Sequence, residues 1–227
     1  METYIQIGAG AGDQDARANF RDGFTEFVKR RHPGQVSRIV LVEPNPFNIE
    51  ALKRCWKDYP QAEIVQMGVC PQSHLTANGR ATFYYAEEDA PCFQVFSIKK
   101  SHVEKHYPSG TIKSVEIPII SINQFIERFI GSSHVSIFAL DIEGIDAEIL
   151  LDIQWRGLNI FRLSFEHIHL GSQKDTVLRH LGQNGYTFIG SGLDVNGFDL
   201  MYENLKFNLP QSASGAVNEG RREARSY

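Results

Sequence analysis

The chain has 227 residues with 42% hydrophobic and 11% aromatic side chains, which fits one large globular domain and excludes a fibrous or wholly disordered protein. Its net charge of -4, from 27 acidic and 23 basic side chains, gives no overall attraction to nucleic acid or to an anionic membrane. The three cysteines lack metal-type or disulfide-type spacing, and neither a membrane-length apolar run nor a signal peptide is visible, so we expect a cytoplasmic protein.

The first third of the chain alternates between apolar strands and amphipathic helices. Tyr4–Ile7 is predicted to be a short strand, and the apolar positions of Ala16–Val28 follow one helix face. Arg38–Pro44 is an almost continuous apolar run, typical of a strand buried on both faces. A helix around Leu52 and a third strand at Ala62–Val69 follow. Helices between successive strands predict parallel pairing and right-handed crossovers.

The middle of the chain is less regular. Gly79–Asp89 and Ser114–Ile120 are predicted to be extended, whereas Ala90–Gly110 has weak periodicity and is expected to form an irregular or capping segment. Ser121 and Gln124 have the spacing of a capping box and precede a clear amphipathic helix.

The last third of the chain predicts two more buried strands, at Val135–Gly144 and Ile160–His167, and a helix that ends near Gly182–Gly185. Two final strands joined by Leu193–Gly197 predict an antiparallel hairpin, since Asn-Gly favours a tight turn. We therefore expect an α/β fold with a doubly wound, mostly parallel sheet and a C-terminal antiparallel hairpin. The domain is assigned to residues 1–207, and 208–227 to a disordered tail.

Ligands of such sheets bind at the carboxyl ends of the strands, near the point where the strand order reverses. After the first strand come Gly8, Gly10 and Gly12, which allow a sharp turn and a close approach of backbone amides to a ligand. A dinucleotide fingerprint would need glycine at position 13, where Asp13 stands. That carboxylate disfavours a pyrophosphate and suits a ligand amino group, although it could equally cap the following helix.

Glu43 closes the second strand, a position from which an acid can accept hydrogen bonds from two ribose hydroxyls. The alternative is an exposed acid before a turn proline. The end of the third strand, Met67–Gln72, is predicted to lie near a purine ring if a nucleoside is bound, with Val69 and Cys70 small enough to flank the ring.

Two acids, Asp141 and Glu143, follow a buried strand and would share one side of the chain if that strand continued. There they could anchor a cation or deprotonate a substrate, or they could be acids favoured by a helix start. His167 and His169 are two residues apart and would share a strand face. We favour His167 as a base or substrate contact over metal binding by this pair, and we predict no metal site.

Several motifs occur in a familiar order: "IGAGAGDQD", "LVEPNPFNIEAL", "IPIISINQFI", "FALDIEGIDAEILL", "SFEH" and "LGQNGYTF". From about Tyr4 to Asn204 the chain resembles the FkbM-type methyltransferase family. The resemblance implies a Rossmann-like class I methyltransferase fold with a seven-stranded sheet. It also implies S-adenosyl-L-methionine as cofactor and a small hydroxylated acceptor, usually a sugar or natural product. The resemblance is also compatible with a homo-oligomer of this chain.

The resemblance implies that Gly8, Gly10 and Gly12 hold the methionine part of the cofactor, that Glu43 binds its ribose and that Asp141 lies by its reacting end, and the positions at strand ends add the other expected site residues. The positions expected to bind the cofactor are Gly8, Ala9, Gly10, Gly12, Asp13, Glu43, Pro44, Asn45, Gly68, Val69 and Asp141. Those expected on the acceptor side, as catalytic residues, are Asp141, Glu143 and His167. A lid over the acceptor is expected from partner subunits or from the Pro71–Pro118 region, whose aromatic residues could stack on a sugar or form core.

Two positions depart from the family pattern. Ala139 stands where a lysine is common, and Asp146 replaces the usual second glutamate. Two other functions therefore stay open: an NAD(P)-dependent oxidoreductase, which the glycine–acid pattern also fits, and an inactive cofactor-binding module. The roughly 35-residue step from Gly8 to Glu43 disfavours the oxidoreductase, because dinucleotide folds place this acid about 20 residues after the loop.

Overall fold

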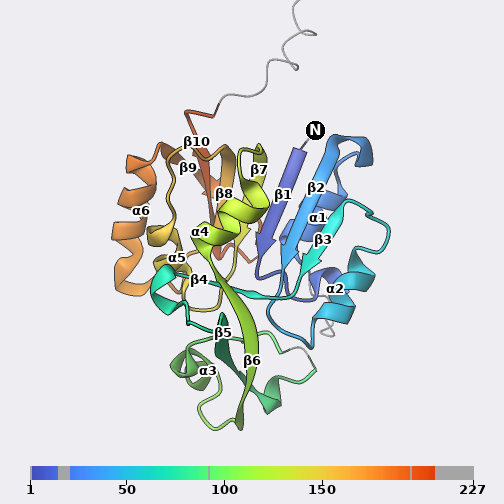
Figure 1. The fold of residues 1–227 in the computed structure, drawn as a ribbon, viewed down its shortest axis with the longest axis vertical. Coiled ribbons are helices and arrows are strands. Elements are labelled where there is room, and N and C mark those ends of the chain that lie inside the picture. Colours follow the sequence, from blue (N-terminus) through green and yellow to red (C-terminus); the bar gives the residue numbers. More distant parts are fainter. Residues whose placement is uncertain (1, 15–20, 92, 195, 208–227) are drawn as a thin grey trace, which may run out of the picture.

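The computed structural model of the chain describes residues 2–14, 21–91, 93–194 and 196–207. Its centre is a seven-stranded sheet in the order β3–β2–β1–β7–β8–β10–β9 (Figure 1). The strands are β1 (Glu2–Ile7), β2 (Val36–Val42), β3 (Ala62–Val65), β7 (Val135–Leu140), β8 (Ile160–Glu166), β9 (Tyr186–Ser191) and β10 (Asp199–Asn204). The first five are parallel to one another, and β10 is antiparallel to both β8 and β9. The predicted seven-stranded, doubly wound sheet with its C-terminal hairpin is confirmed.

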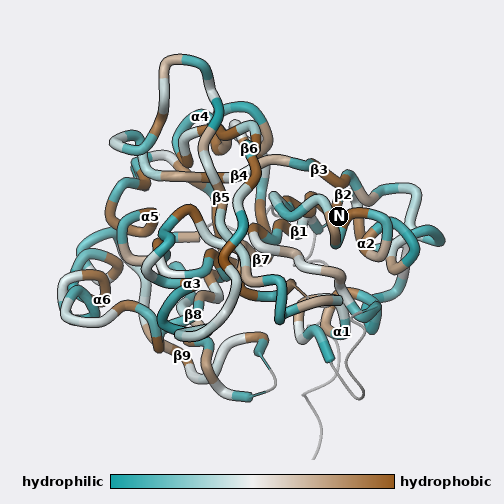
Figure 2. Tube along the Cα trace, turned by 90° about the horizontal axis from the view of Figure 1, so that it is seen from below, coloured by the Kyte–Doolittle hydropathy of each residue, from teal (hydrophilic) through white to brown (hydrophobic). Residues whose placement is uncertain are grey.

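Both faces of this sheet are buried, which explains the continuous apolar runs in its strands. On β1, Tyr4 packs with the helices α1 (Gly23–Lys29) and α2 (Ile49–Cys55), whereas its neighbour Ile5 packs with the cluster on the opposite face. Adjacent strand residues point to opposite faces, so one strand supplies both cores. Figure 2 shows hydrophobic colour along the central strands and more hydrophilic colour on outlying loops.

The opposite face is covered by α4 (Ile122–Phe125) with its π-helical continuation η5 (Ile126–Ile130), by α5 (Asp146–Asp152) and by α6 (Lys174–Gln183). The predicted capping box at the start of α4 is confirmed, since the Ser121 hydroxyl accepts from the Gln124 N–H and the Gln124 side chain accepts from the Ser121 N–H.

A second, three-stranded sheet lies beyond the carboxyl ends of the main strands (Figure 1). It contains β4 (Gly68–Cys70), β5 (Arg80–Ala86) and β6 (Ile112–Ser121), in the order β4–β6–β5. The prediction of one strand over Ala62–Val69 is wrong, because the chain turns at Met67, whose N–H donates to the Val65 carbonyl at 3.2 Å. The chain leaves the main sheet there and enters the small one.

The segment Ala90–Gly110 contains a helix that its sequence did not predict, α3 (Lys100–His106). Only Val103 of this helix is buried, so its seven residues carry almost no hydrophobic periodicity. The helix packs beside β5 at the edge of the small sheet.

Parts of two predictions lie outside the described residues: the beginning of the first helix, at Ala16 and Phe20, and the tail at 208–227. The domain boundary at 207 and the cytoplasmic location stay predictions. Of the helices in the described part of the chain, none has the length and apolar character needed to cross a bilayer.

Candidate active site

A cavity of about 340 Å³ opens at the carboxyl ends of β1 and β7. The chain runs outward from β1 through β2 to β3 and returns to β7, so this is the point where the strand order reverses. The cavity wall comes from the glycine loop, the end of β2, the small sheet, the loop after β7, the end of β8 and the loop between β9 and β10. The ligand position predicted from the fold is therefore a real concavity.

The glycine loop approaches the neighbouring backbone more closely than any side chain would allow. Gly8 has a φ of +84°, and a Cβ there would lie 1.7 Å from the Asp141 carbonyl oxygen. Gly10 has a φ of +54°, lines the cavity, and would place a Cβ where no described atom lies within 4 Å. Gly8 thus lets the loop pack against β7, while Gly10 leaves space for a ligand.

Glu43 is buried directly beside this loop, with 4% of its surface exposed. Its Oε2 accepts from the Gly10 N–H at 2.6 Å and its Oε1 from the Asn45 N–H at 2.8 Å. Burial raises the pKa of Glu43 to about 7, against the lowering effect of these two backbone donors. The predicted exposed-acid alternative is wrong, since the carboxylate is held inside the cavity wall.

Three predicted cofactor residues do not line the cavity among the described residues. Gly12 packs against α2, where a Cβ would come within 2.6 Å of the Cys55 Sγ. Asp13 pairs with Lys29 at 2.8 Å, and the segment that it could cap, 15–20, lies outside the described residues. Asn45 supports Glu43 through its backbone, and its side-chain amide donates to the Phe93 carbonyl at 2.8 Å.

The other predicted cofactor residues line the cavity: Gly8, Ala9, Gly10, Glu43, Pro44, Gly68, Val69 and Asp141. Gly68 lies close under the ring of Phe83, and a Cβ there would come within 2.5 Å of it. Phe83 stacks on Phe96 with ring centroids 5.2 Å apart, and both rings line the cavity. An apolar wall suited to a flat base thus lies on the side that the sequence assigned to a purine.

The described lining is strongly acidic. Its acidic residues are Asp22, Glu43, Asp141, Glu143, Glu166, Asp194 and Asp199. The one basic side chain among the described lining residues, Arg21, pairs with Glu26 outside the cavity. Burial and the neighbouring carboxylates of Glu143 and Glu166 raise the pKa of Asp141 well above its usual range. The site therefore suits a ligand with net positive charge and disfavours a pyrophosphate.

Asp141 and Glu143 both line the cavity, although β7 ends at Leu140 and the predicted strand alternation does not apply to them. Asp141 is solvent-accessible although it lies deep in the protein, because it faces the open cavity. The loop that carries both acids is held by Asp146, whose Oδ1 accepts from the Ile142 N–H at 2.9 Å. Asp146 is thus a positioning residue in the described structure.

His167 is not among the lining residues, and its Nδ1 lies against the Phe198 carbonyl. The prediction that His167 and His169 share a strand face is wrong, because β8 ends at Glu166. Sequence reasoning instead missed Glu166 and Asp199, which reach the cavity from β8 and β10. Burial raises the pKa of Asp199 to about 6, and the Ser164 hydroxyl donates to its Oδ2 at 2.8 Å.

The sheet order, the glycine loop after β1 and the buried acid at the end of β2 together define the Rossmann-like fold of class I methyltransferases. The chain belongs to the methyltransferase FkbM domain family, whose model matches residues 6–188. The cofactor of this class is S-adenosyl-L-methionine.

Solved structures resemble the chain at low identity. The FkbM methyltransferase of Methylobacillus flagellatus KT is 15% identical with a TM-score of 0.47, over 89% of this chain and 43% of that one. Aeropyrum pernix fibrillarin with natively bound S-adenosyl-L-methionine is 11% identical with a TM-score of 0.41, over 89% and 65%. Spermidine synthase of Thermotoga maritima is 14% identical with a TM-score of 0.41, over 88% and 51%.

The chain thus spans less than half the length of the Methylobacillus protein. Among curated proteins, none matches it.

The residues present fit the cofactor. S-adenosyl-L-methionine carries a sulfonium and an ammonium against one carboxylate, so its net charge is opposite to that of the cavity wall. The Glu43 carboxylate stands where two ribose hydroxyls could donate to it, and the open space at Gly10 leaves room for the ligand beside it.

Proposed function

We propose that the chain transfers a methyl group from S-adenosyl-L-methionine to a hydroxyl of a sugar or natural-product acceptor. The observation that carries this proposal is the buried Glu43 carboxylate against the Gly10 amide, at the mouth of an acidic cavity. Membership of the FkbM domain family supports the methyl-transfer chemistry.

In this proposal, Glu43 accepts the ribose hydroxyls, and the Gly68, Val69 and Phe83 side of the cavity contacts the adenine. The glycine loop follows the methionine part of the cofactor, and Asp141 lies near its sulfonium. Fixed carboxylates need no reorganisation to stabilise a cation, so they hold the reacting methyl group in one place.

Bound S-adenosyl-L-methionine supplies an electrophilic methyl group on its sulfonium. With the cofactor and an acceptor bound, a carboxylate of the chain would take the proton that the acceptor hydroxyl gives up in the transfer. Orientation of the reactants can supply about 7–11 kcal/mol of the barrier reduction. Asp141 and Glu143, together with Glu166, are the carboxylates that the cavity offers as base.

The two alternatives differ in what they require of the site. An NAD(P)-dependent oxidoreductase would place a pyrophosphate among the acidic lining residues, at a large electrostatic cost. An inactive module would bind the cofactor without turnover. Ala139 favours that alternative, because this buried position at the cavity holds no lysine.

The proposal is tested with methyl-labelled S-adenosyl-L-methionine and a panel of hydroxylated sugars and natural products. We expect label in at least one acceptor, and a loss of rate of 100-fold or more for Asp141→Asn, the usual scale for a general base. Asp175→Asn, an exposed acid on α6, is the matched control and should keep the wild-type rate. Cofactor binding without any labelled product would favour the inactive module, and an unchanged Asp141→Asn rate would exclude Asp141 as base.

A further inference from the structure

Three histidines from distant parts of the chain meet beside the cavity. His102 and His106 lie four residues apart on α3, so their side chains share one face of that helix. His169 approaches them from the loop after β8. The centroid of the His102 ring lies 4.8 Å from that of His106 and 4.9 Å from that of His169. The centroids of the His106 and His169 rings are 5.6 Å apart.

One ring nitrogen from each of the three histidines lies within 4.8 Å of the others. A tetrahedral zinc ion with Zn–N bonds of about 2.0–2.1 Å needs ligand nitrogens about 3.3–3.4 Å apart. Metal binding would require the imidazole rings to rotate so that these nitrogens come closer together, and two of the three ligands already have the i, i+4 spacing of helical zinc ligands.

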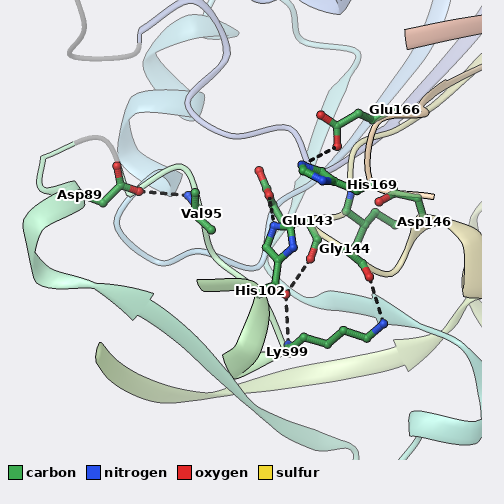
Figure 3. A network of polar contacts seen from close by, with 11 residues as sticks. Asp89, Val95, Lys99, His102, Glu143, Gly144, Asp146, Glu166 and His169 are labelled. Atoms are coloured by element: carbon green, nitrogen blue, oxygen red, sulfur yellow. Dashed lines mark hydrogen bonds and ion pairs between the residues drawn. The ribbon is translucent and has the colours of Figure 1, made fainter. Parts of the chain in front are cut away.

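Two carboxylates lie beside the histidine rings. Glu143 Oε2 lies 2.9 Å from His102 Nε2, and Glu166 Oε2 lies 3.6 Å from His169 Nε2 (Figure 3). Glu166 Oε2 has no hydrogen-bond partner among the described residues. Histidine ligands of metals commonly give their second ring nitrogen to a carboxylate, which fixes the ring and its tautomer. Both carboxylates also line the cavity, so the histidine cluster adjoins its acceptor end.

The fold fixes α3 against the loop that carries Glu143. The Ser97 hydroxyl donates to the Glu143 carbonyl at 2.7 Å, and the Lys99 Nζ donates to the Gly144 carbonyl at 3.0 Å (Figure 3). Gly144 has a φ of +89°, and a Cβ there would come within 2.7 Å of His102 Nδ1, so glycine is what permits the ring to lie this close. These contacts place His102 before any ligand arrives, as a binding site requires.

We propose that His102, His106 and His169 form a binding site for one divalent transition-metal ion of the zinc type. Three neutral imidazoles are a donor set that suits zinc, cobalt and nickel better than magnesium or calcium. With three protein ligands, a fourth position stays open to water, as in catalytic zinc sites. His106 is exposed, so the ion can enter from solvent. The proposal does not depend on the methyl-transfer reaction.

The test uses the full chain without a histidine tag, stripped of metal with a chelator and then titrated with Co²⁺. A tetrahedral site gives a strong visible absorption, and Zn²⁺ added afterwards should abolish that signal by competition. We expect saturation at one ion per chain. His106→Ala removes a ligand that is exposed, so the fold should persist, and we expect at least a tenfold weaker affinity.

His32→Ala is the matched control, since His32 is exposed, follows shortly after α1 and lies outside the cluster. It should keep the wild-type affinity. His169→Ala provides a second ligand variant, and circular dichroism checks that each variant is folded. Absence of stoichiometric binding, or equal affinities for the wild type and a folded His106→Ala, would overturn the site. An equal loss in His32→Ala would mark the binding as adventitious and would overturn it as well.

Discussion

The role of Glu43 predicts a pH-dependent affinity for the cofactor. In the ligand-free protein the pKa of Glu43 is about 7, because the carboxyl group is buried. Ribose hydroxyls donate to the ionised form, so only the ionised fraction of the protein is competent to bind. That fraction rises from about 0.09 at pH 6 to about 0.91 at pH 8, and the apparent Kd should therefore fall about tenfold, or about 1.4 kcal/mol.

The assay is calorimetric titration with S-adenosylhomocysteine at pH 6, 7 and 8. This product carries no sulfonium, so the attraction of the other acids to that cation does not contribute. Glu43→Gln cannot ionise, and it presents an amide N–H to one of the two backbone donors that Glu43 satisfies. We expect this variant to bind at least tenfold more weakly at pH 8 and to lose most of the pH dependence.

Glu50→Gln is the control, because Glu50 is an exposed acid on α2 that pairs with Lys53. It should retain both the affinity and the slope of the wild type. A wild-type affinity that is flat between pH 6 and pH 8, or a slope that survives in Glu43→Gln, would refute the assignment of the ribose hydroxyls to Glu43.

Three further predictions concern stability. Gly8→Ala should lower the free energy of unfolding by about 3 kcal/mol or more, because the new Cβ meets the Asp141 carbonyl at a positive φ. Gly10→Ala should lower it by about 1–2 kcal/mol and should mainly weaken cofactor binding. Urea unfolding measures the loss of stability, and calorimetry measures the loss of binding. The pKa of Glu43 in the folded protein lies above its value of 4.5 in the unfolded chain, so the folded state binds the proton more tightly. The protonated group therefore stabilises the fold fully below pH 4.5, and this stabilisation is lost as the pH rises through about 7. The free energy of unfolding of the ligand-free protein should fall by about 3 kcal/mol from this group alone between pH 4.5 and 8, and an increase over that window would contradict the burial of its charge. Ser121→Ala removes the cap of α4 and should cost about 1 kcal/mol, measured in urea, while a change at exposed Ser172 should cost nothing measurable.

The sheet and the glycine–acid pair could be predicted because their signals are local. A strand buried on both faces is continuously apolar, as in Arg38–Pro44, and Glu43 follows it directly. The break between β3 and β4 could not be predicted, because β-branched apolar residues occur on both sides of Met67, as at Val65 and Val69, and only the pairing with β6 separates the two strands.

The acceptor side of the site was harder to predict for a related reason. Glu166 and Asp199 look like ordinary strand-end acids, and only the antiparallel pairing of β8 with β10 places them side by side at the cavity. The spacing of His102 and His106 was a usable signal, but it required a helix in a segment with a single buried residue. Long-range pairing, rather than local pattern, decides which polar residues meet.

The most direct test of the whole account is a calorimetric titration of the purified chain with S-adenosyl-L-methionine, S-adenosylhomocysteine and NAD. We predict one binding site per chain for the first two ligands at micromolar affinity, and none for NAD. Binding of NAD alone, or of none of the three, would contradict the assignment of the acidic cavity to this cofactor.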